Sequence, residues 1–243
     1  MLDRWIGILT KGILIIGPLF LIFWILKPNF LKKFRIKQIN EISPRTAEEL
    51  GLTFINLTMY LIPFFCLVFA KEKLGIFSVY TDINERGIPY FIFSIFLFMI
   101  INDTWFYWMH RAMHSIKFFK QFHMKHHQSV NTTPLTAYSF NVGEGLINMG
   151  YYIFMIIFVP WHPLALTIFG VVGIAFNSYI HLGYDFAYIA RSKNPVLKWI
   201  NSSTHHSTHH QIFEGNYSVW FTFWDKIMKT EIEDTRIVQK QSI

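Results

Sequence analysis

The sequence contains one cysteine, Cys66, among its 243 residues. An intrachain disulfide is therefore impossible, and because no CxxC pair is present, thiolate sites for zinc or iron–sulfur clusters are excluded. The sequence also lacks a glycine-rich dinucleotide fingerprint. The haem-binding sequence HPGG is absent, since Leu164 follows His162 and Pro163. The chain thus carries no recognisable site for a flavin, a nicotinamide or a haem.

Charged residues are scarce, at 15%, whereas 52% of the residues are hydrophobic and 19% are aromatic. This composition is too apolar for an ordinary soluble domain of this length. Apolar blocks of about 20 residues, the length that crosses a bilayer, lie at 5–26, 52–70 and 89–109. A longer block at 146–176 is interrupted at 160–163 and is interpreted as a hairpin of two spans. The sequence predicts an all-α, polytopic membrane protein with about four to five transmembrane helices.

Acidic residues are fewer than basic ones, 15 against 22, which gives a formal net charge of +7. In a membrane protein, topology explains this excess better than a nucleic-acid partner does. Segments 27–51, 110–144 and 182–243 hold 17 of the 22 basic residues. If the spans alternate sides, these segments share one face, which the positive-inside rule makes cytoplasmic. The N-terminus then lies outside. The Ile-, Lys- and Phe-rich composition and the short loops further suggest a bacterial plasma membrane.

Histidine, by contrast, is concentrated in three short motifs: HRAMH at 110–114, HMKHH at 123–127 and HSTHH at 206–210. Residues three and four apart share one face of a helix, so each motif can direct its imidazoles to one point. Neutral imidazole is the commonest side-chain metal ligand. The predicted ligands are His110, His114, His123, His126, His127, His206, His209 and His210.

Three further residues are placed by their position relative to these motifs. His181 follows the last apolar block and returns to the same interface, which leaves it open between a ligand and a buried structural residue. Asp103 lies seven residues before His110, on the same helical stripe of an apolar span. We predict that its carboxylate orients a ligand imidazole; the alternative is a hydrogen bond to another helix. His162, at the hairpin tip, is expected on the opposite face and is excluded.

Eight or nine imidazoles are too many for one metal ion and are suited to two. Because the motifs contain no carboxylate or thiolate, they favour iron or zinc, and spacing does not choose between these metals. A di-zinc membrane hydrolase therefore stays open. A metal transporter is disfavoured, since its ligands would lie near the midplane of several spans rather than at one edge of the membrane.

The ordered motifs resemble those of the fatty acid hydroxylase/sterol desaturase superfamily over roughly residues 99–230. The resemblance includes DTWFYW at 103–108, HLGYD at 181–185 and QIFEGNYSVWFTFWDKIMKT at 211–230, besides the three histidine motifs. Within the superfamily, the sequence is most similar to C4-methylsterol oxidases, cholesterol 25-hydroxylases and their bacterial relatives. It departs from the family pattern at Asn141, since bacterial relatives often carry Phe-His-Pro before a Glu after the second motif, where this chain has Phe140 to Glu144. It departs again at Lys229, where Gly is usual. These departures concern the substrate side rather than the metal site.

The resemblance implies a membrane-bound non-haem di-iron enzyme that uses O2 to hydroxylate or desaturate a C–H bond of a lipid or sterol-like substrate. It implies that the eight motif histidines are metal ligands and that His181 matches an isolated histidine of the family. His205 aligns with a further histidine, without a clear side of its helix. Electrons would come from a separate donor, a ferredoxin or a cytochrome b5-type protein. N-terminal spans and a basic loop, residues 1–88, would precede a catalytic domain at 89–243.

Overall fold

The computed structural model describes residues 2–36, 43–69, 79–186 and 193–232. Within these ranges the chain is helical and forms no β-strand, only isolated bridges, which confirms the all-α class. Residues 37–42, 187–192 and 233–243, which include some of the counted basic residues, lie outside the described ranges. The α-helices are α1 (Leu2–Phe20), α2 (Thr46–Met59), α3 (Leu61–Phe69), α4 (Gly87–Ser115), α5 (Lys117–His127), α6 (Val142–Asn148), α7 (Tyr151–Phe158), α8 (Pro163–Ile180), α10 (Ser203–Ile212) and α11 (Phe223–Ile227).

Three of the described helices are long and apolar enough to cross a membrane: Ile6–Leu26, Gly87–Ser115 and Pro163–Ile180. The first combines α1 with a π-helical turn, Leu21–Leu26. The predicted count of four to five transmembrane helices is therefore not confirmed. Two of the predicted spans are instead divided into shorter helices.

The predicted span at 52–70 divides at Tyr60, between α2 and α3. Pro63 explains the break, because its nitrogen has no hydrogen to donate to the carbonyl of Met59 and its ring would clash with that carbonyl. The first arm of the predicted hairpin divides between α6 and α7 at Gly150. A side chain at Gly150 would collide with the ring of Trp105 from α4, so the glycine permits this close approach.

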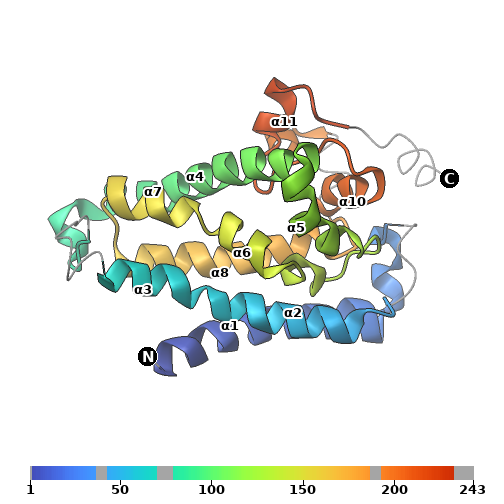
Figure 1. Cartoon of the computed structure of the whole chain (residues 1–243), viewed down its shortest axis with the longest axis horizontal. Helices are drawn as coiled ribbons and strands as arrows, with labels where there is room; N and C mark the ends of the chain where they lie inside the picture. The colour runs from blue at the N-terminus through green and yellow to red at the C-terminus, as the bar shows by residue number, and fades with distance from the viewer. Residues whose placement is uncertain (1, 37–42, 70–78, 187–192, 233–243) are drawn as a thin grey trace.

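The long helices run along the longest axis of the molecule (Figure 1). Helices α1, α4 and α8 all lead from the end where α1 begins to the end where α5, α10 and α11 gather. Large apolar side chains such as Leu14, Phe96 and Val172 are exposed on their outer faces. We interpret these faces as lipid-facing, because a soluble protein would rarely expose so much apolar surface. The beginning of α1 and the histidine motifs therefore lie at opposite ends of the molecule.

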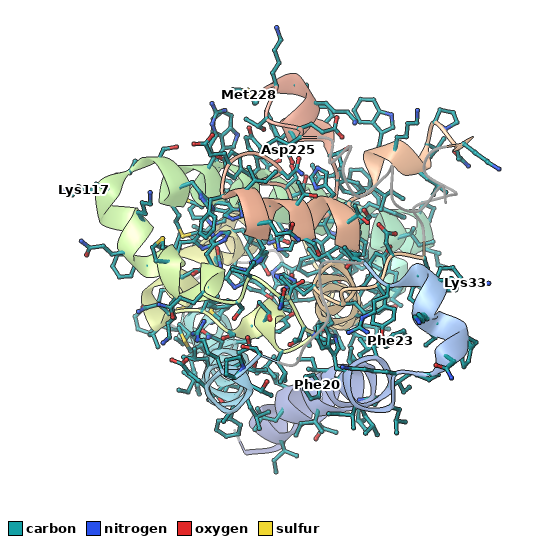
Figure 2. The ribbon with its side chains drawn as sticks, turned by 90° about the vertical axis from the view of Figure 1, so that its right-hand side faces the viewer. Phe20, Phe23, Lys33, Lys117, Asp225 and Met228 are labelled. Atoms are coloured by element: carbon teal, nitrogen blue, oxygen red, sulfur yellow. The ribbon has the colours of Figure 1, made fainter. Side chains whose placement is uncertain are left out.

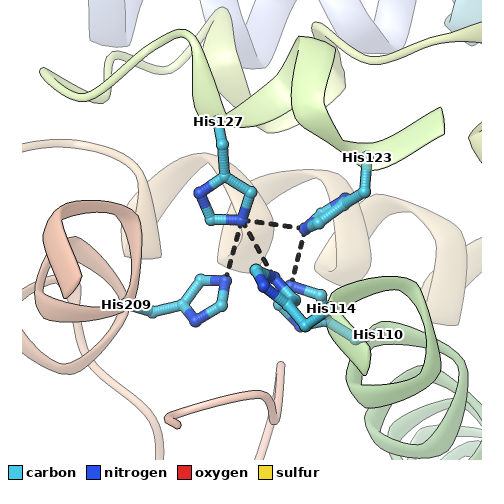
Figure 3. A group of neighbouring side chains, drawn as sticks. All are labelled: His110, His114, His123, His127 and His209. Atoms are coloured by element: carbon cyan, nitrogen blue, oxygen red, sulfur yellow. Dashed lines mark hydrogen bonds between the residues drawn. The ribbon is translucent and has the colours of Figure 1, made fainter. Parts of the chain in front are cut away.

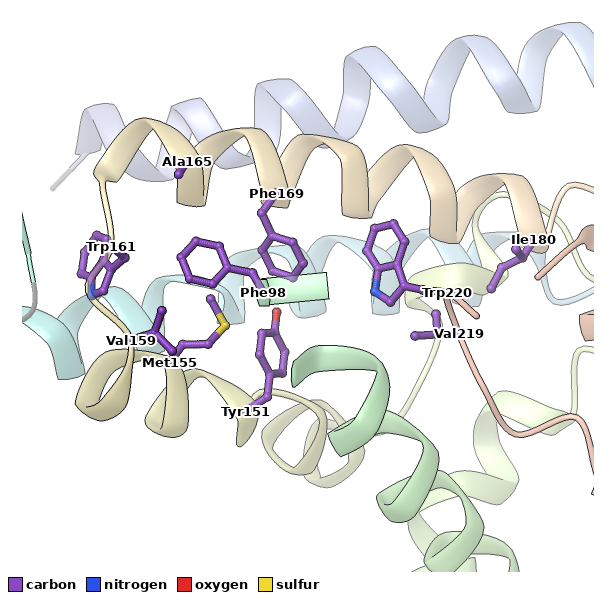
Figure 4. Close-up of a cluster of buried hydrophobic side chains, with 10 residues drawn as sticks. All are labelled: Phe98, Tyr151, Met155, Val159, Trp161, Ala165, Phe169, Ile180, Val219 and Trp220. Carbon is purple, nitrogen blue, oxygen red and sulfur yellow. The ribbon is translucent and has the colours of Figure 1, made fainter. Parts of the chain in front are cut away.

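The main hydrophobic core joins α4, α7 and α8 to the segment before α11 (Figure 4). Trp220 from that segment stacks on Phe176 of α8, with ring centroids 4.9 Å apart, and its indole N–H donates to Asn102 of α4 at 2.7 Å. The C-terminal segment is thereby fixed against the long helices. The buried members of this core are Phe98, Tyr151, Met155, Val159, Trp161, Ala165, Phe169, Ile180, Val219 and Trp220.

Candidate metal centre

The nine predicted metal ligands lie at one end of the molecule, in two groups. Within each group, the candidate ligand atoms lie within 4.8 Å of one another. Figure 3 shows the first group, whose imidazoles point toward a common centre. The first group consists of His110, His114, His123, His127 and His209, and the second of His126, His181, His206 and His210.

Helical spacing explains how the motifs are divided between the groups. In α5, His123 and His127 are four residues apart on one face and join the first group, whereas His126 points to the second. In α10, His209 joins the first group and His210 the second. Each HxxHH motif therefore serves both groups, and the groups are adjacent. The rings of His127 and His210, one from each group, have centroids 4.7 Å apart.

Backbone carbonyls hold several imidazoles by the nitrogen that points away from the centre. Nδ1 of His110 lies 2.7 Å from the carbonyl of Tyr217, and Nδ1 of His209 lies 2.7 Å from that of Gly215. In the second group, Nδ1 of His181 lies 2.8 Å from the carbonyl of Asn177. A carbonyl only accepts, so each Nδ1 carries the hydrogen and the opposite nitrogen, Nε2, presents a lone pair.

The Nε2 atoms of this group converge on one point. Nε2 of His127 lies 2.9 Å from Nε2 of His123 and 3.1 Å from Nε2 of His114 and of His209. Nε2 of His110 is 2.9 Å from Nε2 of His123, and both of these rings already donate through Nδ1, so no hydrogen is available between the two Nε2 atoms. A cation at the centre would satisfy the lone pairs together, so the residues fit a metal ion.

The second group shows the same convergence, with Nε2 of His206 2.9 Å from Nε2 of His181. Both nitrogens of His210 are buried without a hydrogen-bond partner. Buried polar atoms are rarely left without one, and a metal ligand is a common reason for the exception. The second group therefore fits a metal ion as well.

Burial keeps the imidazoles neutral. Desolvation lowers the pKa of His126 to about 4 and that of His181 to about 3. Metal binding requires the neutral imidazole, so these side chains are in the binding form at neutral pH. Desolvation, reinforced by neighbouring imidazoles, also lowers the pKa values of His123, His127, His206, His209 and His210.

Asp103 is buried as predicted, but the prediction that it hydrogen-bonds a ligand imidazole is corrected by its contacts. Its Oδ1 accepts backbone N–H bonds from Val219, Trp220 and Phe221, at 3.2, 2.7 and 3.3 Å. Asp103 thus anchors the segment that carries Tyr217, whose carbonyl orients His110. It acts on the site through the backbone of that segment.

Glu144 provides the contact that was assigned to Asp103, and the sequence reasoning missed it. Its Oε1 accepts from Nδ1 of His123 at 2.8 Å, and only 3% of either side chain is exposed. The carboxylate of Glu144 also accepts a hydrogen bond from the side chain of Asn148. The available signal was the family pattern itself, in which a glutamate follows the second histidine motif.

Two histidines lie outside both groups. Nε2 of His205 is 3.9 Å from a carboxylate oxygen of Asp225, and His205 belongs to neither group. His162 caps the start of α8: its Nδ1 accepts from the N–H of Leu164 at 3.0 Å, and its Nε2 donates to the carbonyl of Thr81 at 2.9 Å. The 18 residues of α8, about 27 Å of helix, separate His162 from His181.

Two cavities lead to the two groups from different sides. A cavity of about 720 Å³ reaches His126, His181 and His206 of the second group, and it is lined mainly by apolar residues of α1, α3, α4, α7 and α8. A cavity of about 550 Å³ reaches His114, His123 and His127 of the first group. The cavity at the first group has the more polar lining, which includes Lys120 and Lys229. Both basic side chains lie at the histidine end, where Lys33 and Lys117 are also peripheral (Figure 2).

Residues 95–230, more than half of the chain, match the family described as "Fatty acid hydroxylase". The chain therefore belongs to the fatty acid hydroxylase family. It is 31% identical over 203 residues to a lathosterol oxidase of Rattus norvegicus, covering 82% of this chain and 62% of the relative. It is 32% identical over 161 residues to a Delta(7)-sterol 5(6)-desaturase of Schizosaccharomyces pombe, covering 65% and 50%. No solved structure matches the chain.

A putative methylsterol monooxygenase of Dictyostelium discoideum is 34% identical over 150 residues, covering 59% of this chain and 52% of the relative. A similarity to methylsterol oxidases was expected from the sequence, and it stands beside similarity to sterol desaturases. The chain spans between half and about three fifths of the length of these curated relatives. All three are eukaryotic, so they lend no support to the prediction of a bacterial plasma membrane.

Proposed function

We propose that this chain is a membrane-bound di-iron oxidoreductase that uses O2 to hydroxylate or desaturate a C–H bond of a lipid or sterol-like substrate. The observation that carries the proposal is the pair of adjacent histidine groups beside a long apolar cavity. The names of the relatives, an oxidase, a desaturase and a monooxygenase acting on sterols, support the same chemistry.

The ligand set favours iron over zinc. Zinc in structural sites is almost always four-coordinate, whereas the first group offers five imidazoles. An ion that accepts five or six ligands, such as iron, uses this set more completely. The di-zinc hydrolase is therefore the weaker candidate. A metal transporter is weaker still, because both groups lie at one end of the long helices.

Bound iron would supply the activation of O2 that oxidation of an unreactive C–H bond requires. The chain itself holds the substrate and excludes water. The apolar cavity follows α8 from His181 to Pro163, about 27 Å, which suits an extended lipid with one end at the second group. Ile8 of α1 and Leu61 of α3 also line it, so a lipid can enter laterally from the bilayer.

The electron donor in this proposal is a ferredoxin or a cytochrome b5-type protein. The polar cavity at the first group supports a donor on the side away from the lipid, since Lys120 and Lys229 line it and suit an acidic partner. We further propose that the histidine end faces the cytoplasm, by the positive-inside rule.

We retain the division into N-terminal spans, residues 1–88, and a catalytic domain, residues 89–243, as part of the proposal. The N-terminal part braces the site. Nδ2 of Asn56 in α2 donates to the carbonyls of Tyr138 and Phe140, each at 2.9 Å, and Ser139 between them offers its carbonyl to His126. Removing residues 1–88 is therefore expected to disorder the second group.

The test is metal analysis and oxygen uptake of the purified full chain, followed by lipid mass spectrometry of cells that express it, with and without O2. We expect two iron ions per chain and a lipid product that forms only with O2. Zinc at two ions per chain, with a product that forms equally without O2, would establish the hydrolase instead.

A further inference from the structure

The wall of the lipid cavity contains one polar spot with a buried acceptor that lacks a partner. Most amides there are engaged: Asn177 donates to the carbonyl of Ala137 at 3.0 Å, and Asn102 accepts from Trp220 at 2.7 Å. Outside the histidines, Glu144 and Asn148 form a polar pair in this wall, in which the amide of Asn148 donates to the carboxylate of Glu144. Oδ1 of Asn148 is buried without a hydrogen-bond partner.

This hydrogen-bonded pair lies next to the metal groups. Glu144 and Asn148 are four residues apart in α6, hence on one face of the helix, and both line the cavity. Through Oε1, Glu144 holds His123 of the first group at 2.8 Å. The polar spot is therefore at the histidine end of the cavity, while apolar residues such as Trp161 line the far end.

Oδ1 of Asn148 is suited to accept a hydrogen bond, and an unpartnered buried acceptor is unfavourable until a donor reaches it. Resting on the function proposed above, we propose that Asn148, held in place by Glu144, forms a subsite for a hydroxyl group of the lipid substrate. The hydroxyl donates to Oδ1 of Asn148, and the apolar remainder of the lipid extends along α8.

The ligand is a neutral donor. A carboxylate, as in a free fatty acid, has no hydrogen to donate to Oδ1 of Asn148. An ammonium headgroup would be repelled by bound metal ions in a poorly hydrated site. The imidazole of His123 lies between Glu144 and the centre of the first group. The oxidised carbon is therefore expected within a few bonds of the hydroxyl.

The test measures how binding depends on the hydroxyl, using quenching of tryptophan fluorescence in the metal-loaded full chain, because Trp161 and Trp220 line the cavity. The probes are lathosterol and its methyl ether, 1-octadecanol and its methyl ether, and octadecanoate. We expect at least one alcohol to bind about tenfold more tightly than its ether, and octadecanoate to bind more weakly than octadecanol.

Asn148→Leu should reduce the preference for the alcohol to less than threefold while the metal content stays unchanged. Thr167→Val is the matched control. Thr167 lines the same cavity, but its hydroxyl already donates to the carbonyl of Pro163, so the preference should persist. Asn148 bonds to Glu144 rather than to a histidine, and Glu144 keeps its own bond to His123 in this variant, so metal content should be retained.

Equal affinity of the wild type for both alcohols and their ethers would overturn the proposal, and so would no binding of either alcohol. A preference that survives Asn148→Leu would overturn the role of Asn148. These results are separable from the proposed function. Iron-dependent oxygen uptake without an alcohol preference would refute the subsite alone, whereas an alcohol preference in a protein that binds no iron would refute the oxygenase alone.

Discussion

Replacing Glu144 by leucine tests whether the metal centre depends on a carboxylate outside the set of ligands. Oε1 of Glu144 fixes the hydrogen of His123 on Nδ1, which leaves Nε2 free to bind metal. Leucine fills a similar volume but accepts nothing. The N–H of His123 would then be buried without an acceptor, or the hydrogen would move to Nε2 and block the ligand atom.

The magnitude follows from this geometry. The bond is 2.8 Å long and both side chains are 3% exposed, so water has little access to replace the lost acceptor. Loss of such a supporting contact typically weakens metal binding by about 10- to 100-fold. This corresponds to roughly 1.4–2.7 kcal/mol for the ion at the first group. The second group contains no ligand held by Glu144, so its affinity should change little.

Competition with a graded series of chelators, followed by metal analysis, measures this difference. Glu144→Leu should release one ion at a chelator strength about 10- to 100-fold lower than the wild type requires, and the second ion near the wild-type value. Glu144→Gln keeps an acceptor oxygen at the same place and should lie between the two. Unchanged release in Glu144→Leu, or equal weakening of both ions, would refute the reasoning.

Three other perturbations have defined outcomes. His126→Ala should leave the chain inserted in the membrane but lower its metal content and abolish turnover. His162→Ala should cost about 1 kcal/mol of stability through a lost helix cap and leave the metal content unchanged. Metal analysis and turnover assays distinguish the two variants. Asp103→Leu leaves three backbone N–H groups without an acceptor and should lower the free energy of unfolding by roughly 3–5 kcal/mol. Asp103→Asn keeps an acceptor oxygen and should lower it by about 1 kcal/mol, as measured by thermal unfolding. Without metal, the free energy of unfolding should fall as the pH drops from about 6.5 toward 4. The reason is that His126 binds a proton in this range in the unfolded chain but not in the folded chain, where its pKa is lowered to about 4. Equal stability at pH 7 and pH 5 would contradict this.

The nearness of the histidines within each motif was predictable, because residues three and four apart lie close together on a helix whatever the rest of the fold does. The expectation that each motif directs its imidazoles to one point was wrong for the two HxxHH motifs, since each divides its histidines between the two groups. The division into two groups was not predictable. It assigns neighbouring histidines, such as His126 and His127 of α5, to different groups, according to how α5 and α10 pack against α4 and α8.

Contacts across long sequence separations account for the errors. The stripe that joins Asp103 to His110 was a sound reason to expect a buried acid, and Asp103 is 3% exposed. Its partners, however, come from a segment more than 110 residues later, which no local pattern identifies. The count of four to five spans is not confirmed for a local reason, since Pro63 divides an apolar block that hydropathy alone joins.

The same structure explains how an all-imidazole centre would hold two cations in a poorly hydrated place. Neutral imidazoles bring no negative charge, and Glu144 is the carboxylate that hydrogen-bonds to a candidate ligand among the described residues. The compensation would come instead from dipoles. The carbonyls of Asn177, Gly215 and Tyr217 each polarise the Nδ1–H of a candidate ligand at 2.7–2.8 Å and so increase the electron density that the imidazole offers. Two of these carbonyls belong to the segment after α10 that Asp103 and Asp225 hold through backbone N–H bonds. The buried acids would thus stabilise bound cations by fixing the carbonyls around them, so the loss of either acid should weaken metal binding without removing a ligand.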